Sequence, residues 1–215
     1  GRRIGVVSGV QGLRWYELTI TGRESHAGTT PMPRRADAML GCARVTEAVR
    51  TIAREAGPFS VGTVGRVEVR PNSPNVIPGV VVMTVDLRDA SDAVLAGMHA
   101  RLQATIADIA RAEGLEIAVR ETANTPAVVF AATCVGAVRA AAERLGLAHR
   151  DIVSGAGHDA CFINRVAPTA MIFVPCADGI SHNEIENATP ADCESGCNVL
   201  LDVAIRAANE AEALG

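Results

Sequence analysis

The chain of 215 residues has no lysine, only 3% aromatic residues and no long apolar run. All 20 basic residues are arginine, which we interpret as a genomic bias in composition. A net charge of −4, with no basic stripe interleaved with aromatic residues, argues against a nucleic-acid surface. The longest apolar runs are strand-sized, well short of the roughly 20 residues of a membrane helix. We therefore expect a cytoplasmic protein with neither nucleic acid nor a membrane as a partner.

The six cysteines include no C-x-x-C pair, so the usual spacing of a structural zinc site is missing. Cys193 and Cys197 lie four residues apart on an expected helix and so share a face. The other cysteines supply no obvious disulfide partners. We expect reduced, buried thiols.

The N-terminus, residues 1–7, has neither an initiator methionine nor a signal-peptide pattern. It leads directly into a strand-like apolar run. We expect a chain that begins inside a longer protein.

The sequence contains enough apolar material for a packed core, with 48% hydrophobic and 20% charged residues. From about residue 14 to residue 122 the periodicity follows the order β-α-β-β-α-β. Strands are expected at 15–21, 62–70, 80–88 and 115–122, and helices at 36–55 and 91–113. This order is typical of a ferredoxin-like module, in which a four-stranded antiparallel sheet carries two helices on one face.

After about residue 124 the pattern becomes that of an α/β domain with a parallel or mixed sheet. Helices are expected at 134–145, 159–164 and 190–214, and strands at 4–7, 151–154 and 169–174. Thr189 as N-cap with Pro190 in the first helical position is a good start signal for the last helix. Because so few strands cannot close such a layer, we expect strands 4–7 and 169–174 to leave sheet edges open.

Three of the five histidines, His26, His158 and His182, lie in short polar segments flanked by glycine, each after a strand-like run. Loops at strand ends are where α/β proteins hold side chains that meet a ligand. His182 is a candidate metal ligand, although a solvated surface histidine is the simpler interpretation of its position alone. His158 could donate to an oxyanion or to a substrate carbonyl, or lie solvated at a helix end.

A catalytic triad of Ser154, His158 and Asp159 is not expected. Sequence neighbours rarely fit the geometry of such a triad, and the chain has no G-x-S-x-G nucleophile elbow.

Two further polar residues are candidates for substrate binding. Arg88 ends a strand, where its guanidinium could clamp a carboxylate through two parallel hydrogen bonds or simply lie on the surface. Asn75 lies in a rigid turn next to Pro74, where its amide could cap the turn or bind a substrate oxygen.

Five short motifs follow one another along the chain: S-H-A-G-T-T-P, S-P-N-V-I-P-G, V-D-L-R, S-G-A-G-H-D-A and D-G-I-S-H-N-x-x-E. In this order and spacing they resemble the hydantoinase/carbamoylase family of M20-type dinuclear metallohydrolases. That family includes N-carbamoyl-L-amino-acid hydrolases, β-ureidopropionases and allantoate amidohydrolases. The resemblance covers nearly all 215 residues.

The resemblance implies a metal-dependent amidohydrolase that cleaves the ureido C–N bond of N-carbamoyl-L-amino acids or related ureido acids. Two divalent ions (Zn, Mn, Co or Ni) would serve the complete enzyme, with His182 as a ligand and His158 binding substrate beside the metals. Residues 1–12 would end an N-terminal catalytic segment at a hinge. Residues 13–123 would form a lid and dimerisation domain, and residues 124–215 the C-terminal part of the catalytic domain.

The same resemblance assigns roles within the lid domain. Asn75 and Arg88 would hold the substrate carboxylate. His26 would enter the site of the partner subunit of a homodimer and polarise the scissile carbonyl. Gln11 and Gly12 would lie at the hinge, and Gln11 would also bind substrate.

The chain departs from the family in two respects. Ala36 stands where the family usually has a basic residue, so that contact is lost or moves to Arg35. Relatives also carry an N-terminal half with an H-x-D metal pair, paired glutamates that supply the general base, and a further histidine ligand. We interpret this chain as having neither an H-x-D pair nor adjacent glutamates. We therefore expect the substrate-binding half of the enzyme, inactive alone and binding metal at most weakly.

Two alternatives stay open from the sequence. The chain could belong to an allantoate amidohydrolase or to an aminoacylase or peptidase of the broader M20 group. It could instead be a non-catalytic ferredoxin-like dimerisation module that retains site residues.

Overall fold

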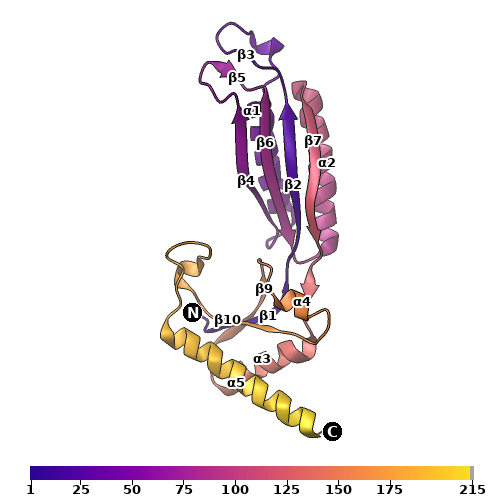
Figure 1. Cartoon of the computed structure of the whole chain (residues 1–215). Coiled ribbons are helices and arrows are strands. Elements are labelled where there is room, and N and C mark those ends of the chain that lie inside the picture. The colour runs from indigo at the N-terminus through magenta and orange to yellow at the C-terminus, as the bar shows by residue number, and fades with distance from the viewer. Residues whose placement is uncertain (214–215) are drawn as a thin grey trace. The chain divides into compact units, whose positions relative to one another are not determined.

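The computed structural model describes residues 1–213 and divides the chain into two compact units. The inserted unit is Gln11–Ala127. The split unit combines Gly1–Val10 with the described residues from Val128 onward. Both units contain helices and strands, so the chain is a mixed α/β protein (Figure 1).

The inserted unit is built on a four-stranded sheet. Its strands, in spatial order, are β4 (Val61–Arg70), β6 (Val80–Asp89), β2 (Gly12–Thr21) and β7 (Glu116–Thr125). Every neighbouring pair is antiparallel. Helices α1 (Ala38–Ala56) and α2 (Asp92–Glu113) both cover the same face of this sheet (Figure 1).

The strict alternation of buried and half-buried side chains along β6 explains why the helices cover one face of the sheet. Val81, Met83, Val85 and Leu87 are buried beneath the helices, while the residues between them are only half-buried. Side chains of period two point to opposite faces of a strand. Arg88 therefore lies on the face that the helices leave uncovered.

The two helices begin and end where local chemistry requires. The Asp37 carboxylate accepts hydrogen bonds from the amides of Met39 (2.9 Å) and Leu40 (3.3 Å), so α1 begins at Ala38, two residues later than the periodicity predicted. The Ser91 hydroxyl caps α2, as predicted. Gly114 ends α2 with a φ of 62°, a left-handed conformation that glycine adopts without strain.

A small ribbon of β3 (Ser25–His26) and β5 (Val76–Ile77) lies beyond one end of the main sheet (Figure 1). A short 3-10 turn, η1 (Met32–Arg34), connects this ribbon to the start of α1. Two-residue strands carry too little periodicity to be predicted from sequence, and neither was.

The split unit has β1 (Ile4–Val10) at the centre of its sheet. Parallel β9 (His149–Ser154) pairs with one edge of β1, and antiparallel β10 (Met171–Phe173) and β8 (Val128–Val129) pair with the other. The expectation that residues 4–7 leave an open edge is therefore wrong, because both edges of β1 are hydrogen-bonded.

Helices α3 (Ala132–Arg144) and α5 (Pro190–Ala213) complete the split unit, with the shorter α4 (Ala160–Ile163) and η2 (Ala177–Gly179). Val6 and Val7 of β1 pack in one cluster with Val138 of α3 and Val199 of α5. The end of the last helix expected near Leu214 lies outside the described residues.

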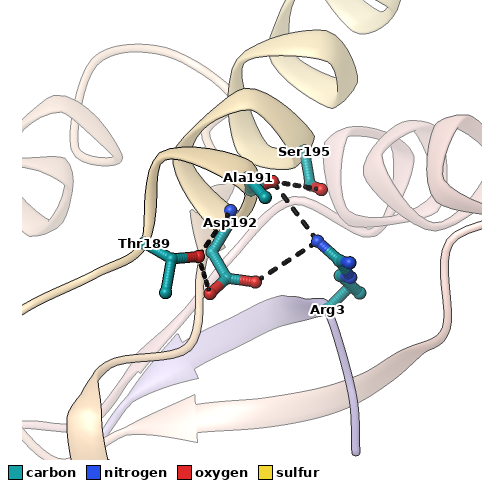
Figure 2. A network of polar contacts seen from close by, with 5 residues as sticks. All are labelled: Arg3, Thr189, Ala191, Asp192 and Ser195. Carbon is teal, nitrogen blue, oxygen red and sulfur yellow. Dashed lines mark hydrogen bonds and ion pairs between the residues drawn. The ribbon is translucent and has the colours of Figure 1, made fainter.

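Figure 2 shows the polar contacts at the start of α5. The Thr189 hydroxyl accepts a hydrogen bond from the Asp192 amide (3.2 Å), which confirms the expected N-cap. The Asp192 carboxylate in turn forms an ion pair with Arg3 (3.5 Å), and Arg3 also donates to the carbonyl of Ala191 (3.4 Å). These contacts fix the N-terminus of α5 against the segment that leads into β1.

The cysteines are all free, as expected, but they are not all buried. Cys42 is buried, whereas Cys193 and Cys197 are exposed. The buried face of α5 carries Ser195 and Val199 instead, so the two cysteines lie on its solvent side. Among the described residues, no helix is both long and apolar enough to span a bilayer.

Candidate functional site

His26 lies in the β3–β5 ribbon with its imidazole exposed. Its Nδ1 atom accepts hydrogen bonds from the backbone amides of Gly28 (3.0 Å) and Thr29 (3.3 Å). A ring nitrogen that accepts a hydrogen bond carries no proton, so the neutral ring carries its proton on Nε2. The local backbone therefore leaves His26 with an Nε2–H donor.

Asn75 lies directly before β5, next to the segment that follows His26. Its carbonyl accepts a hydrogen bond from the amide of Ala27 (2.9 Å), and its Oδ1 accepts one from the hydroxyl of Ser73 (2.9 Å). The side chain is exposed, and its amide nitrogen is the group left to act as a donor. The structure thus brings His26 and Asn75 together at one end of the inserted unit.

Arg88 lies near the opposite end of the same unit, on the uncovered face of the sheet. Its guanidinium donates from Nε to both oxygens of Asp86 (3.1 and 3.0 Å) and from Nη2 to Oδ2 (2.7 Å). Asp86 is two residues earlier on the strand and therefore on the same face. The sequence analysis missed Asp86, although the D-x-R spacing on a strand was signal enough to find it.

The length of the strands separates Arg88 from His26 and Asn75. Arg88 pairs with Leu13 near the start of β2, whereas Val80 at the other end of β6 pairs with Thr21. The eight residue-to-residue steps from Val80 to Arg88 span about 26 Å at roughly 3.3 Å per step. The β3–β5 ribbon, which contains His26 and follows Asn75, lies beyond the Val80 end (Figure 1). In one copy of the chain, Arg88 and Asn75 therefore cannot hold the same small carboxylate.

The surroundings of Arg88 are largely apolar. Leu13 and Val61 lie directly across from it on the two neighbouring strands. Trp15, the only tryptophan of the chain, lies directly across from Asp86 and is 44% exposed. Cross-strand neighbours on one face have Cβ atoms about 5 Å apart. A ligand held by Arg88 would therefore contact these side chains.

Farther along the uncovered face, Glu17 of β2 connects the adjacent strand β7 with β4, which lies two strands away on the other side. It accepts hydrogen bonds from Arg120 of β7 (2.8 Å) and Arg66 of β4 (2.9 Å). The hydrogen bond from Arg120, followed by the charges of both arginines, lowers the pKa of the Glu17 carboxyl below its ordinary value. The arginines of this part of the sheet are thus paired internally.

Gln11 and Gly12 lie where the chain enters the inserted unit. The Gln11 side-chain amide donates to the carbonyl of Phe59 (2.9 Å). A Cβ at Gly12 would lie 2.7 Å from the amide nitrogen of Ala127, so only glycine fits beside the returning chain. The Ala127 amide in turn donates to Asp92 (2.8 Å), which fixes the leaving segment to the start of α2.

In the split unit, His158 is half-buried after β9. Its Nε2 atom lies 3.0 Å from the hydroxyl of Ser154, and its ring makes an edge contact with Phe173 (5.6 Å between centroids). Sequence reasoning missed this Ser–His contact because it considered the pair only as part of a triad. Ser154 is 2% exposed and also donates to the carbonyl of Ala156, so it positions the imidazole and is not an accessible nucleophile.

His182 is exposed in the segment after η2 and has a φ of 60°, which is uncommon outside glycine. Its Nδ1 atom lies 2.9 Å from the Ser181 hydroxyl, and its backbone amide donates to the Glu186 carboxylate (2.8 Å). The described residues contain no cluster of three or more histidine, cysteine, aspartate or glutamate side chains that could hold a metal. The chain by itself therefore does not fit a complete metal site.

One H-x-D triplet does occur in the chain, His149-Arg150-Asp151, so the interpretation that the chain has none is wrong. It lies on β9 and its side chains have other partners. Asp151 forms an ion pair with Arg139 (2.7 Å), which lowers the pKa of the Asp151 carboxyl, and His149 Nδ1 lies 3.1 Å from the carbonyl of Leu147. This triplet is not a metal pair.

The family model and the individual relatives that match this chain agree with one another. The model of peptidase family M20/M25/M40 matches residues 13–206. An N-carbamoyl-L-amino-acid amidohydrolase of Rhizobium meliloti is 45% identical over 211 residues, which are 98% of this chain and 51% of that protein. An allantoate amidohydrolase of Escherichia coli is 36% identical over 200 residues, 93% of this chain and 49% of that protein.

A crystal structure of a hydantoinase/carbamoylase family amidase from Burkholderia multivorans matches with a TM-score of 0.91 at 57% identity. The match covers 94% of this chain and 49% of that one. The chain thus spans about half the length of the relatives it matches.

Proposed function

This chain belongs to peptidase family M20/M25/M40, and from this membership we propose that it supplies the substrate-binding and dimerisation half of a metal-dependent ureido amidohydrolase. The substrates proposed are N-carbamoyl-L-amino acids or closely related ureido acids. The observation that carries the proposal is the pair of unlike groups at the two ends of the inserted unit. Arg88 is a bidentate carboxylate binder, and His26 is an Nε2–H donor.

The separation of these groups supports a site shared between two copies of the chain. A ureido acid is far shorter than the roughly 26 Å of strand between Arg88 and the His26 end. A site that uses both groups on one substrate therefore takes Arg88 from one copy and His26 with Asn75 from the other. We propose a homodimer in which each inserted unit serves both sites.

The inserted unit is proposed to be the ferredoxin-like lid and dimerisation domain. The strand order β4-β6-β2-β7, with one helix between β2 and β4 and the other between β6 and β7, supports this assignment. The close approach of Gly12 to Ala127 supports a hinge where the chain enters and leaves the unit. Closure about such a hinge would exclude water from the substrate.

The proposed chemistry divides between recognition and polarisation. Arg88 would exchange part of its pairing with Asp86 for the substrate carboxylate, a charge-assisted contact of the same geometry. His26 Nε2–H would donate to the scissile carbonyl oxygen as negative charge develops there. His158 would bind substrate from the split unit, and Gln11 would do so beside the hinge. Divalent metal ions, with His182 as one ligand, would supply the activated water in a complete enzyme.

The names of the relatives suggest two kinds of ureido substrate. One relative is named for N-carbamoyl-L-amino acids and another for allantoate. We favour the N-carbamoyl-L-amino acids because Leu13, Trp15 and Val61 surround Arg88 with apolar groups that suit an amino-acid side chain. Hydrolysis of the ureido group releases ammonia and carbon dioxide from either substrate, so in an active enzyme the organic product distinguishes the two reactions: a free L-amino acid in one case, and a product that still carries a ureido group in the other. This chain alone is proposed to hydrolyse neither, with or without Zn or Mn, because it lacks the remaining ligands and the base; measurable metal-dependent turnover would contradict this.

Ligand binding to Arg88 tests the proposal directly. Trp15 is the only tryptophan and lies across from Asp86, so its fluorescence reports on this part of the sheet. We expect N-carbamoyl-L-phenylalanine to change the emission saturably, and Arg88→Ala to weaken the apparent affinity about tenfold or more, the loss of a charge-assisted contact. Arg120→Ala is the control, since this arginine is on the same face but paired with Glu17. Equal binding by the Arg88→Ala variant would refute the proposal.

A further inference from the structure

The loop that follows His26 is held by one arginine that the proposed mechanism does not use. Arg35 donates from Nη2 to the carbonyl of Ala27 (2.6 Å) and from Nε to the carbonyl of Thr30 (3.1 Å). These two carbonyls lie near the two ends of the tight loop 27–30. A single half-buried guanidinium thus connects both ends of the loop.

The Ala27–Gly28 peptide links Arg35 to the imidazole. Its carbonyl accepts from Arg35, and its N–H, which belongs to Gly28, donates to His26 Nδ1 (3.0 Å). In a trans peptide the C=O and N–H bonds point in opposite directions. Fixing the carbonyl on the side of Arg35 therefore aims the N–H at the imidazole. Hydrogen bonds in such a chain polarise and strengthen one another.

The other contacts of the loop also hold it close to the His26 ring. The amide and hydroxyl of Thr30 both donate to the carbonyl of His26 (3.2 and 2.8 Å). Gly28 allows the ring to lie close to the loop, since a Cβ there would be 3.3 Å from His26 Cε1. The imidazole therefore packs against the backbone of the loop that follows it, with Nδ1 facing the loop amides.

Arg35 is itself fixed to the folded core of the inserted unit. Its backbone amide donates to the carbonyl of Met32 (3.2 Å), and the neighbouring Ala36 carbonyl accepts from the amide of Arg23 (2.8 Å). Two residues later, Asp37 caps α1. The guanidinium thus extends from the anchored start of a long helix to an exposed loop.

We infer that Arg35 is a positioning residue for His26, which holds the imidazole in its Nε2–H form through the Ala27–Gly28 peptide. This inference rests on the proposed role of His26 as a donor to the substrate carbonyl. Protonation of Nδ1 would break the bonds from Gly28 and Thr29, so the arrangement selects one tautomer. The sequence gives no hint of this, because the contact depends on how the loop folds back onto residue 35.

Nuclear magnetic resonance of the whole 215-residue chain tests the inference without any catalytic assay. The imidazole nitrogen shifts of His26 report its tautomer, and the water-exchange rate of the Gly28 amide reports the bond to Nδ1. At an alkaline pH of about 8.5 we expect the Nε2–H form and a protected Gly28 amide. Arg35→Ala should speed exchange of that amide roughly tenfold and let the Nδ1–H form appear.

Arg34→Ala is the matched control, because Arg34 is adjacent and its exposed side chain has no hydrogen-bond partner among the described residues. It should leave both readouts unchanged. Arg35→Lys should recover part of the protection, since an ammonium reaches one carbonyl at a time. If Arg35→Ala fails to fold, Arg35→Gln, which can donate to one carbonyl, takes its place.

Unchanged exchange and tautomer in the Arg35 variants would overturn the inference, and so would equal changes in Arg34→Ala. Failure of the proposed function is a separate result. It would appear as ligand binding that does not depend on Arg88, whatever the spectra show for Arg35.

Discussion

At the scale of single residues, charge pairing across strands gives the uncovered face of the inserted unit a measurable pH response. The hydrogen bond from Arg120 is the largest cause of the lowered pKa of the Glu17 carboxyl, with Arg66 a smaller one. A carboxyl whose pKa is lower in the folded than in the unfolded chain stabilises the fold above the ordinary value of 4.5. That contribution is lost as the pH falls from this value through the lowered folded-state pKa.

We therefore predict that Arg120→Gln raises the pKa of Glu17 toward its ordinary value, and does so more than Arg66→Gln. Carbon-detected titration of the Glu17 carboxyl in the three proteins measures both shifts. The same substitutions should reduce the difference in stability between neutral and acidic pH. A Glu17 titration that is identical in Arg120→Gln and in the unaltered chain would show that the cross-strand bond does not form in solution.

At the scale of elements, α1 depends on its first turn because its N-cap also anchors the segment that carries Arg35. Asp37 satisfies two amides that have no partner within the helix. We predict that Asp37→Ala lowers the free energy of unfolding by about 1 kcal/mol, measured by urea denaturation. Asp108→Ala is the comparison, since Asp108 is exposed on α2 and forms an ion pair with Arg111 at the surface. Equal losses for the two variants would mean that capping is not the cause.

At the scale of the whole molecule, the proposed use of Arg88 and His26 on one substrate requires two copies of the chain. We predict a dimer in solution at micromolar concentration, measured by light scattering during size-exclusion chromatography. His182→Ala should leave the mass unchanged, because that residue lies in the split unit and the proposed interface in the inserted unit. A monomer would remove the shared site from the proposal, while dimer loss on His182→Ala would move the interface to the split unit.

The sequence was sufficient for most elements of the fold because their signals are local. Periodicity of two predicted β2, β4, β6 and β7, and the caps at Ser91 and Gly114 marked the ends of α2. Pairing partners were harder, since they depend on residues far apart in the chain. The central position of β1 follows from its pairing with β9 and β10, more than 140 residues later, and no local pattern encodes it.

For the candidate site, too, some features follow from the sequence and others only from the tertiary structure. The sequence by itself determined which residues we propose for the chemistry, because His26, Asn75, Arg88, His158 and His182 lie in motifs that resemble one family. Only the tertiary structure decided what those residues can do together. The antiparallel register places Arg88 about 26 Å of strand from the His26 end, and the fold of one loop aims a peptide N–H at Nδ1. The distance between Arg88 and His26 and the direction of the Gly28 N–H bond are set by the packing of the folded chain, so the order of the residues alone does not predict them.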